Sequence, residues 1–248
     1  MTQHTYEWVL QCSKIIAPNV IHLFFKLKKN IAFSFVAGQF ITIHIPHDGE
    51  ILNRNYSIAN VPSENCDTLE IICARVENGR ASNFFFNMHP GDTVMSGRPR
   101  GNFILQNKSN YSRYILIATN SGVAPYRSMM QEIQNLMNTN TEIEVVLLFG
   151  IRKRENLFFK DDFLSFAKAN PKFKFLICYS REDSIIDSSY ERLGHVQDSL
   201  EELQLNAKKD IVYICGNPDM VNDVKAICFS KNFSNKNIIR EKYSISKK

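Results

Sequence analysis

Nowhere does the chain contain an uninterrupted apolar run approaching the ~20 residues that a membrane-spanning helix requires. Its first seven residues, MTQHTYE, lack the basic start and the apolar core of a secretion signal. No stretch interleaves basic residues with aromatic ones, as nucleic-acid-binding segments do. We therefore expect no membrane span and no nucleic-acid partner, and the cytoplasm is the expected location.

Closely spaced cysteines are also missing. The six cysteines are scattered along the sequence, at Cys12, Cys66, Cys73, Cys178, Cys215 and Cys228. Such spacing fits neither a zinc site nor an iron–sulfur site, and a cytoplasmic protein keeps its thiols reduced. We expect neither a metal nor a disulfide.

The composition is that of a globular protein. Of the 248 residues, 44% are hydrophobic and 22% are charged, which is enough to bury two cores of ordinary size. The chain has 30 basic and 25 acidic residues, a formal net charge of +5. That excess fits an acidic partner, although many solvated surfaces have such a balance by chance.

Up to about residue 105, short β-rich runs are separated by glycine, proline and asparagine. We expect strands at residues 8–10, 20–27, 39–45, 56–59, 69–76 and 93–95, and one helix over residues 82–88. Six short strands at this spacing predict a small antiparallel β-barrel.

From residue 114 onward, apolar strands alternate with helical segments. We expect strands at residues 114–119, 143–149, 173–178 and 211–215, and helices over 125–137, 160–168, 196–203 and 219–229. This alternation predicts a doubly wound parallel sheet. The polar stretch 106–110 marks the change, so the predicted domains are residues 1–107 and 108–248.

The tetrad Arg54-Asn55-Tyr56-Ser57 is the most informative stretch of the first half. On a strand, alternate side chains share a face, so Arg54 and Tyr56 lie together. The guanidinium can grip a diphosphate while the phenol covers an isoalloxazine ring, and Ser57 then points at the ring edge. Taken alone, a Tyr-Ser step is more often ordinary sheet, so the interpretation depends on the other motifs.

A candidate diphosphate site follows at Gly79-Arg80-Ala81-Ser82. A glycine turn lets the backbone approach an anion closely, Ser82 can cap the following helix, and the free amides of the first helical turn attract phosphate. The alternative is a plain helix N-cap. Because Arg54 lies upstream in the same predicted barrel, the flavin interpretation is favoured.

Residues 118–127, ATNSGVAPYR, leave a strand, turn on small residues and enter a helix with Pro125 near its first position. This is the order of a nucleotide site, with Thr119, Ser121 and Gly122 as its candidates. It is not Gly-x-Gly-x-x-Gly, so a dinucleotide fingerprint cannot be claimed, and a tight strand-to-helix turn stays the alternative.

A second loop, Cys215-Gly216-Asn217-Pro218, also leaves the carboxyl end of a strand, where doubly wound sheets bind their ligands. Two such loops predict one crevice lined by Gly216 and Asn217. Cys215 belongs to this loop, although a lone cysteine is usually a small buried hydrophobe.

Arginines follow the two neighbouring strands. Arg152 comes after the strand at 143–149, and Ser180-Arg181-Glu182 comes after the strand at 173–178. Two converging guanidiniums and a hydroxyl suit the 2′-phosphate of NADPH better than the bare ribose of NADH. The alternative is solvated surface arginine.

With these residues in this order, the chain resembles the ferredoxin–NADP reductase family over nearly its whole length. The matching motifs are the flavin motif at Arg54, Tyr56 and Ser57, the diphosphate motif at Gly79 and Ser82, the domain-joining turn Arg98-Pro99-Arg100-Gly101-Asn102-Phe103, the nucleotide loop from Thr119 to Arg127, the 2′-phosphate motif Ser180-Arg181-Glu182, Cys-Gly-Asn-Pro at Cys215 to Pro218, and the terminal Glu-x-aromatic element at Glu241 and Tyr243.

Three positions depart from the family pattern. Asn120 stands where the nucleotide loop usually opens with glycine, and asparagine tolerates the left-handed conformation this turn needs. Gly194-His195 stands where some bacterial members have Gly-Arg, which leaves Arg192 as the candidate replacement. Five residues follow Tyr243, so the resemblance leaves open whether this ring stacks on a flavin.

The resemblance implies an enzyme that binds FAD and NADPH and moves hydride between them, with single electrons going to a separate ferredoxin or flavodoxin. The acidic face of that carrier would meet the basic surface of this chain, and a monomer is expected. The implied catalytic residues are Ser57, Cys215 and Glu241, with Tyr56 stacked on the flavin. The alternatives are the reductase component of an oxygenase, an NAD(P)H-flavin reductase, or a flavoprotein without catalytic activity.

Overall fold

The computed structural model describes residues 5–29, 31–108 and 110–243. Their contacts divide the chain into two compact units. The first comprises the chain up to Leu105 together with Ala124–Met129, and the second comprises Gln106–Val123 and the chain from Met130 onward. The segment Ala124–Met129 thus groups with the first unit, although the sequence placed it in the second domain. No helix among the described residues is long and apolar enough to cross a membrane.

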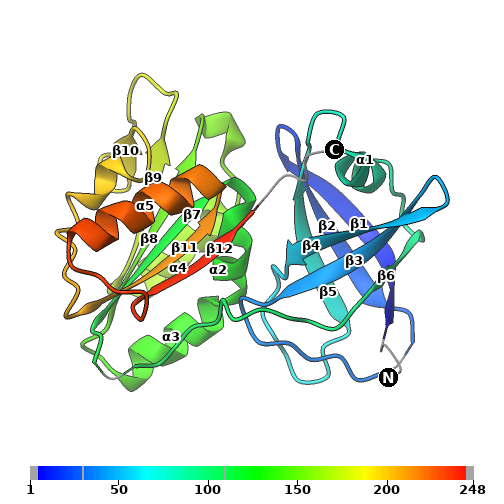
Figure 1. Cartoon of the computed structure of the whole chain (residues 1–248), viewed down its shortest axis with the longest axis horizontal. Helices are drawn as coiled ribbons and strands as arrows, with labels where there is room; N and C mark the ends of the chain where they lie inside the picture. The colour runs from blue at the N-terminus through cyan, green and yellow to red at the C-terminus, as the bar shows by residue number, and fades with distance from the viewer. Residues whose placement is uncertain (1–4, 30, 109, 244–248) are drawn as a thin grey trace. The chain divides into compact units, whose positions relative to one another are not determined.

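The first unit is a six-stranded antiparallel sheet in the order β4-β3-β6-β1-β2-β5 (Figure 1). Its elements are β1 (Tyr6–Ala17), β2 (Val20–Leu27), β3 (Phe40–His47), β4 (Glu50–Ser57), β5 (Thr68–Ala74), α1 (Arg80–Phe86) and β6 (Thr93–Ser96). The two edge strands meet, because Ile58 forms a bridge with Ile71 and the Ala59 N–H donates to the Glu70 carbonyl at 2.8 Å. The sheet therefore closes into a barrel.

Alternate residues of each strand fill the barrel. Ile41, Ile43 and Ile45 of β3 are fully buried, as is Trp8 of β1. A buried indole needs a partner for its N–H, and Trp8 Nε1 donates to the Ser96 hydroxyl at 2.8 Å. The period-two pattern of the sequence is thus the pattern of the core.

The second unit is a six-stranded parallel sheet in the order β10-β9-β8-β7-β11-β12. Its strands are β7 (Arg113–Thr119), β8 (Glu144–Ile151), β9 (Phe173–Tyr179), β10 (Glu191–Leu193), β11 (Asp210–Gly216) and β12 (Ile238–Lys242). The strand order reverses between β7 and β11. In such sheets a ligand crevice opens at the carboxyl ends of the two strands where the order reverses.

Helices cover both faces of this sheet. The helical elements after β7 are η1 (Asn120–Val123), α2 (Ala124–Ser128, in the first unit), α3 (Met130–Thr139), η2 (Arg154–Asn156), α4 (Lys160–Ala169), η3 (Asp198–Leu200) and α5 (Pro218–Ser230). Helix α5, orange in Figure 1, packs Val221 and Val224 against the buried side chains of β7, β8 and β11. On α4, Phe163 lies 5.2 Å from the Phe175 ring of β9.

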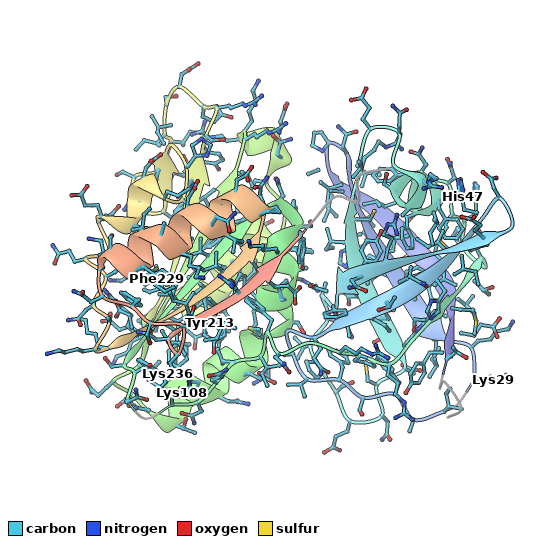
Figure 2. The ribbon with its side chains drawn as sticks, in the orientation of Figure 1. Lys29, His47, Lys108, Tyr213, Phe229 and Lys236 are labelled. Carbon is cyan, nitrogen blue, oxygen red and sulfur yellow. The ribbon has the colours of Figure 1, made fainter. Side chains whose placement is uncertain are left out.

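The segment after Leu105 is fixed to the second unit. The Gln106 N–H donates to the Tyr213 hydroxyl, and the Tyr114 hydroxyl donates to the Gln106 carbonyl, both at 2.8 Å. Lys108 Nζ donates to the Lys236 carbonyl at 3.1 Å, and Figure 2 shows these two lysines side by side. These bonds explain why the first unit ends before residue 106.

The predicted fold class, an antiparallel barrel followed by a doubly wound parallel sheet, is confirmed. Several elements differ from the expectation. Strand β4 begins at Glu50 and not at residue 56, and β10 and β12 were not predicted. The helix expected over residues 196–203 is only the short η3, because the backbone turns at Gln204, with φ 45°, before a second helical turn closes. The helix expected over residues 125–137 is broken at Met129.

Candidate functional site

Strand β4 presents two different faces. Asn53 and Asn55 lie on one face, where the Asn55 side chain accepts a hydrogen bond from the Thr42 hydroxyl at 2.8 Å. Arg54 and Tyr56 are half-buried on the other face. The cation and the flat ring are therefore neighbours along one surface, and any contact of Asn55 with a ligand there would come from its backbone.

A phenylalanine of α1 fixes the orientation of the Tyr56 ring. The Tyr56 ring meets the Phe85 ring edge to face, with centroids 5.1 Å apart and planes at 81°. Burial raises the pKa of the Tyr56 hydroxyl well above its usual range, and the neighbouring Cys73 thiol raises it further, while the charge of Arg54 lowers it. Tyr56 is thus a neutral phenol whose orientation is set by packing.

Arg54 is the cation of this surface. Its guanidinium donates to the Asn53 carbonyl at 2.8 Å. Within residues 5–29, 31–108 and 110–243 it forms no ion pair with a carboxylate, so its charge is not neutralised by the protein there. Ser57, the last residue of β4, is 5% exposed and pairs with Phe40 of β3.

The turn before α1 has room for glycine alone. A Cβ atom on Gly79 would lie 2.7 Å from both the Ser82 hydroxyl and the Val76 side chain. Gly79 is the N-cap residue of α1, so the expectation that Ser82 caps the helix was wrong. Ser82 lies inside the first turn, and its hydroxyl instead accepts from the Val76 N–H at 3.1 Å and bonds the Gly79 carbonyl at 2.9 Å.

Asn83 is the first residue of α1 whose backbone N–H has an acceptor in the same helix, because it donates to the Gly79 carbonyl at 2.9 Å. The amides of the three preceding residues, Arg80, Ala81 and Ser82, therefore have no intrahelical acceptor. Arg80 is exposed beside them. Free amides and a close-packed glycine turn fit a diphosphate.

In the second unit, the loops after β7 and β11 touch backbone to backbone. A Cβ on Gly122 would strike the Cys215 carbonyl and lie 2.8 Å from the Gly216 Cα. The Asn217 N–H donates to the Thr119 hydroxyl at 3.1 Å. The structure thus brings the predicted Thr119, Gly122, Gly216 and Asn217 together where the strand order reverses, with Ser121 half-exposed beside them.

Two conformational details of these loops bear on the sequence predictions. Asn120 adopts the left-handed conformation, with φ 49°, which confirms that asparagine can replace glycine in this turn. The Asn217 side chain accepts from the Asp219 N–H at 2.7 Å and so caps α5, with Pro218 at the start of the helix. Because its side-chain oxygen is already used as the cap of α5, Asn217 would contact a ligand mainly through its other atoms.

Cys215 pairs with Glu241 in the register of β11 and β12. Burial raises the pKa of the Cys215 thiol well above its usual value and the charge of Glu241 raises it further, while a side-chain hydrogen bond with Tyr243 lowers it. A fully buried neutral thiol is not a nucleophile. The Tyr243 N–H donates to the Gly216 carbonyl at 2.8 Å, which holds the end of β12 against this loop.

The predicted phosphate residues lie at the carboxyl ends of β8 and β9. The Arg181 N–H donates to the Arg152 carbonyl at 2.9 Å, and the Ser180 N–H donates to the Ile151 carbonyl at 3.0 Å. Both arginine side chains are exposed. In the described part of the chain neither has a carboxylate partner. Two exposed arginines whose backbones are bonded to each other, and which have no carboxylate partner among the described residues, are a candidate site for an anion.

Arg192, the candidate replacement for the missing arginine, is engaged elsewhere. Its guanidinium forms a two-pronged pair with Glu202, at 2.7 and 2.6 Å, and donates to the Ser188 carbonyl at 2.6 Å. Sequence reasoning did not single out Arg154, whose guanidinium bridges Glu182 and Glu191. Its only signal was the basic run at residues 152–154.

Two family models match the chain. An oxidoreductase FAD-binding domain matches residues 7–104, and an oxidoreductase NAD-binding domain matches residues 116–226. Ferredoxin–NADP reductase B of Sorangium cellulosum is 28% identical over 228 residues, which are 90% of this chain and 90% of that protein. The chain belongs to the ferredoxin–NADP reductase family. As a family member it is an oxidoreductase with an FAD-binding and an NAD(P)-binding domain.

Other members of the family differ in name and length. The flavodoxin/ferredoxin–NADP reductase of Buchnera aphidicola is 29% identical over 82% of this chain and 84% of its own length. The toluate 1,2-dioxygenase electron transfer component of Pseudomonas putida is 24% identical over 98% of this chain and 69% of its own length. A ferredoxin–NADP reductase structure from Neisseria gonorrhoeae with bound FAD and NADP superposes with a TM-score of 0.82 at 23% identity, covering 96% of this chain and 98% of that one.

Proposed function

We propose that this family member is an FAD-containing NADPH reductase that delivers single electrons to a separate ferredoxin or flavodoxin. The observation that carries the choice of NADPH is the pair of exposed guanidiniums of Arg152 and Arg181, which have no carboxylate partner in the described residues. Such a pair fits the 2′-phosphate that distinguishes NADPH from NADH. The names of the Sorangium and Buchnera relatives support the same reading.

The residues of the barrel fit FAD. Tyr56 offers a neutral flat ring in a fixed orientation, and Arg54 on the same face offers a charge that no described carboxylate neutralises. The turn at Gly79, which a Cβ would fill, leaves the amides of Arg80 to Ser82 for the diphosphate. When bound, FAD supplies the chemistry that links a two-electron hydride donor to one-electron carriers.

The residues of the second unit fit a nicotinamide dinucleotide. The backbone of Thr119 to Gly122 and of Gly216 and Asn217 would hold its diphosphate and nicotinamide, and the buried Cys215 would pack behind them as an apolar surface. Glu241 would hydrogen-bond near the nicotinamide, with Tyr243 beside it, while Ser57 of the first unit would hydrogen-bond near the reacting end of the flavin. The contribution of the protein is to position the reactants and exclude water.

The test is the flavin absorbance of the purified protein under anaerobic conditions. Addition of NADPH should bleach the flavin band, NADH should bleach it less completely or more slowly, and oxidised ferredoxin or flavodoxin should restore it. The exchange with the carrier should weaken as salt is added, because an acidic carrier is attracted by the basic chain. A yellow protein that neither nucleotide reduces would refute the proposal.

A second candidate function is the reductase component of an oxygenase. It is favoured by the similarity to the toluate dioxygenase component and to terephthalate 1,2-dioxygenase reductase component 1 of a Comamonas species, which is 27% identical over 85% of this chain and 60% of its own length. An acceptor assay separates the two. Rapid reoxidation by an oxygenase or by free flavin, with none by ferredoxin or flavodoxin, would favour this candidate.

A further inference from the structure

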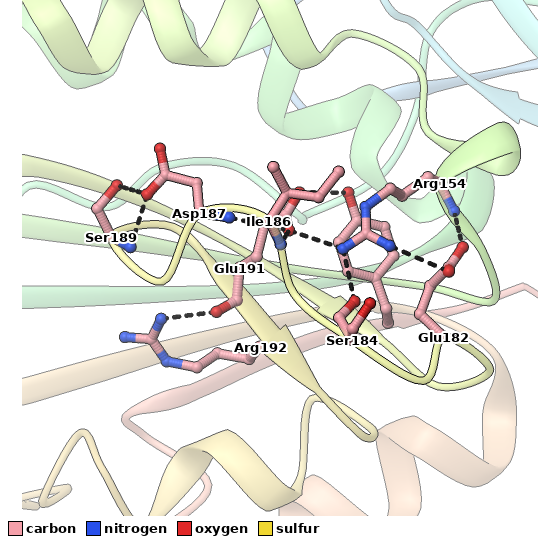
Figure 3. Close-up of polar contacts among 9 residues, drawn as sticks. Arg154, Glu182, Ser184, Ile186, Asp187, Ser189, Glu191 and Arg192 are labelled. Carbon is pink, nitrogen blue, oxygen red and sulfur yellow. Dashed lines mark hydrogen bonds and ion pairs between the residues drawn. The ribbon is translucent and has the colours of Figure 1, made fainter.

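Arg154 connects three segments of the second unit (Figure 3). It lies in η2, just after β8, and its guanidinium donates to the Glu182 carboxylate at 3.0 Å, to the Ser184 carbonyl at 2.7 Å and to the Glu191 carboxylate at 2.9 Å. Its backbone N–H also donates to Glu182, at 2.8 Å. One side chain thus fastens the loop after β8 to the loop after β9 and to β10.

Glu191 is the buried anchor of this network. Only 1% of it is exposed, and its carboxylate also accepts the Ile186 N–H at 2.7 Å and the Tyr179 hydroxyl at 3.3 Å. Burial alone would raise the pKa of Glu191, but the hydrogen bonds from Arg154 and from the Ile186 and Asp187 amides outweigh it and lower the pKa to about 2. The anchor is therefore a carboxylate at neutral pH.

The network acts next to the two exposed arginines. Glu182 directly follows Arg181, and Arg154 stands two residues after Arg152. The backbones of Arg152 and Arg181 are joined by the 2.9 Å bond described above, so the network clamps both sides of that bond. It also turns the two nearby carboxylates toward Arg154, which leaves Arg152 and Arg181 without an acidic partner among the described residues.

We propose that Arg154, with Glu182 and Glu191, is a positioning residue that sets the preference for a 2′-phosphorylated dinucleotide. It does so by fixing the backbone that carries Arg152 and Arg181 and by holding both carboxylates away from the phosphate. This inference rests on the proposed NADPH site. It differs from a purely structural role, because a loop brace would affect every adenine nucleotide alike.

The experiment measures binding of adenosine 2′,5′-bisphosphate and of AMP by calorimetry, which does not depend on turnover. Arg154→Lys keeps the charge but cannot make the three forked bonds at once. It should weaken the bisphosphate about tenfold, as expected when a charge-assisted hydrogen bond is lost, and change AMP binding less than about twofold. Unchanged bisphosphate binding, or an equal loss for both ligands, would overturn the inference.

The variant Glu182→Ala gives a second, independent test, because the two possible roles of Glu182 predict changes in affinity of opposite direction. If Glu182 acts by positioning, its removal should weaken the bisphosphate. If it acts only as a nearby negative charge, removal should tighten binding, and that result would overturn the inference. Because Glu182 is partly exposed, this variant remains informative even if Arg154→Lys fails to fold.

The neighbouring Arg192–Glu202 pair supplies a matched control. It is also two-pronged and partly exposed. Arg192 of β10 also donates to the Ser188 carbonyl in the loop that carries Arg181, so the control variant is made at Glu202, which lies outside that loop. Glu202→Gln should leave both affinities unchanged, and a loss in this variant equal to that in Arg154→Lys would overturn the inference. Arg181→Ala tests the underlying site: if it keeps the preference for the bisphosphate, the proposed NADPH site fails. If Arg181→Ala loses the preference for the bisphosphate and Arg154→Lys keeps it, only the positioning role of Arg154 is refuted.

Discussion

Arg127 of α2 donates to the carboxylate of Glu70 of β5 at 2.8 Å. The same guanidinium donates to the Ala59 carbonyl at 2.9 Å, and the His22 ring nitrogen lies 2.9 Å from the same Glu70 oxygen. All of these residues belong to the first unit. Helix α2 directly follows the nucleotide loop in sequence, so the chain passes from that loop into a segment bonded to the barrel.

Replacing Arg127 should destabilise the protein. Arg127→Ala removes the cation from a carboxylate that is only 21% exposed, so we expect a loss of about 2 kcal/mol in the free energy of unfolding, typical of a hydrogen bond to a charged group. Urea denaturation measures the change. The control is Lys26→Ala, whose partner Asp67 is 54% exposed and whose loss should cost about 0.5 kcal/mol or less. Equal losses of unfolding free energy in the two variants would show that the Arg127–Glu70 pair stabilises the fold no more than the exposed Lys26–Asp67 pair does.

The buried carboxylate of Glu191 should make stability depend on acid pH. Its pKa is lowered in the folded protein from 4.5 to about 2, so its contribution is complete above about pH 4.5 and disappears as the pH falls toward 2. Glu191→Gln should therefore be less stable than the wild type by about 3 kcal/mol at neutral pH, because Arg154 loses its buried partner, and the difference should shrink on acidification.

Unfolding free energies of the two proteins, measured across that pH range, check this expectation. The exposed Glu144→Gln serves as the control, and its small effect should stay constant with pH. A difference between the wild type and Glu191→Gln that grows as the pH falls would contradict the assignment of Glu191 as the ionised anchor.

The fold was predictable because both halves carry strong periodic signals. In the barrel, Ile41, Ile43 and Ile45 alternate with less buried residues, and in the parallel sheet the continuous apolar run of β8 is buried throughout its length apart from Glu144. Strand β4 was only partly recognised, since Asn53 and Asn55 are poor strand formers. Their side chains find partners across the sheet on β3, which no local pattern reveals.

The candidate sites were predictable where a motif is contiguous and hidden where contacts join distant segments. The nucleotide loop and the Ser180-Arg181 motif each lie within a few residues. The bond between Arg154 and Glu191 joins residues 37 apart, and that between Arg127 and Glu70 joins residues 57 apart. The break at Met129 also lies beside contacts between distant segments, because the side chains of Arg127 and Ser128 bond to the barrel carbonyls of Ala59 and Asn60.

Gly122 should not tolerate a side chain. The Cβ of Gly122→Ala would strike the Cys215 carbonyl, and backbone cannot yield as a flexible side chain can. We expect a destabilisation of about 2 kcal/mol, as for overpacking of a close-packed site, and weaker AMP binding because the two loops are forced apart. Gly97→Ala is the control, since the nearest atom to its Cβ would be 4.0 Å away. Melting temperatures and calorimetry measure both effects, and a Gly122→Ala protein that behaves like Gly97→Ala would contradict the backbone contact.

Ser57 should matter for the reaction and not for holding the flavin. Ser57→Ala removes one hydroxyl at the buried end of β4, while Arg54, Tyr56 and the turn at Gly79 are left intact. The protein should therefore purify yellow, with hydride transfer from NADPH slowed about tenfold, the typical effect of one lost hydrogen bond in the transition state. Anaerobic stopped flow measures the rate. Thr42→Val, which removes a different hydroxyl, one that bonds the Asn55 side chain, should leave the rate unchanged. If Ser57→Ala transfers hydride at the wild-type rate, its hydroxyl has no part in the mechanism and the role passes to Glu241.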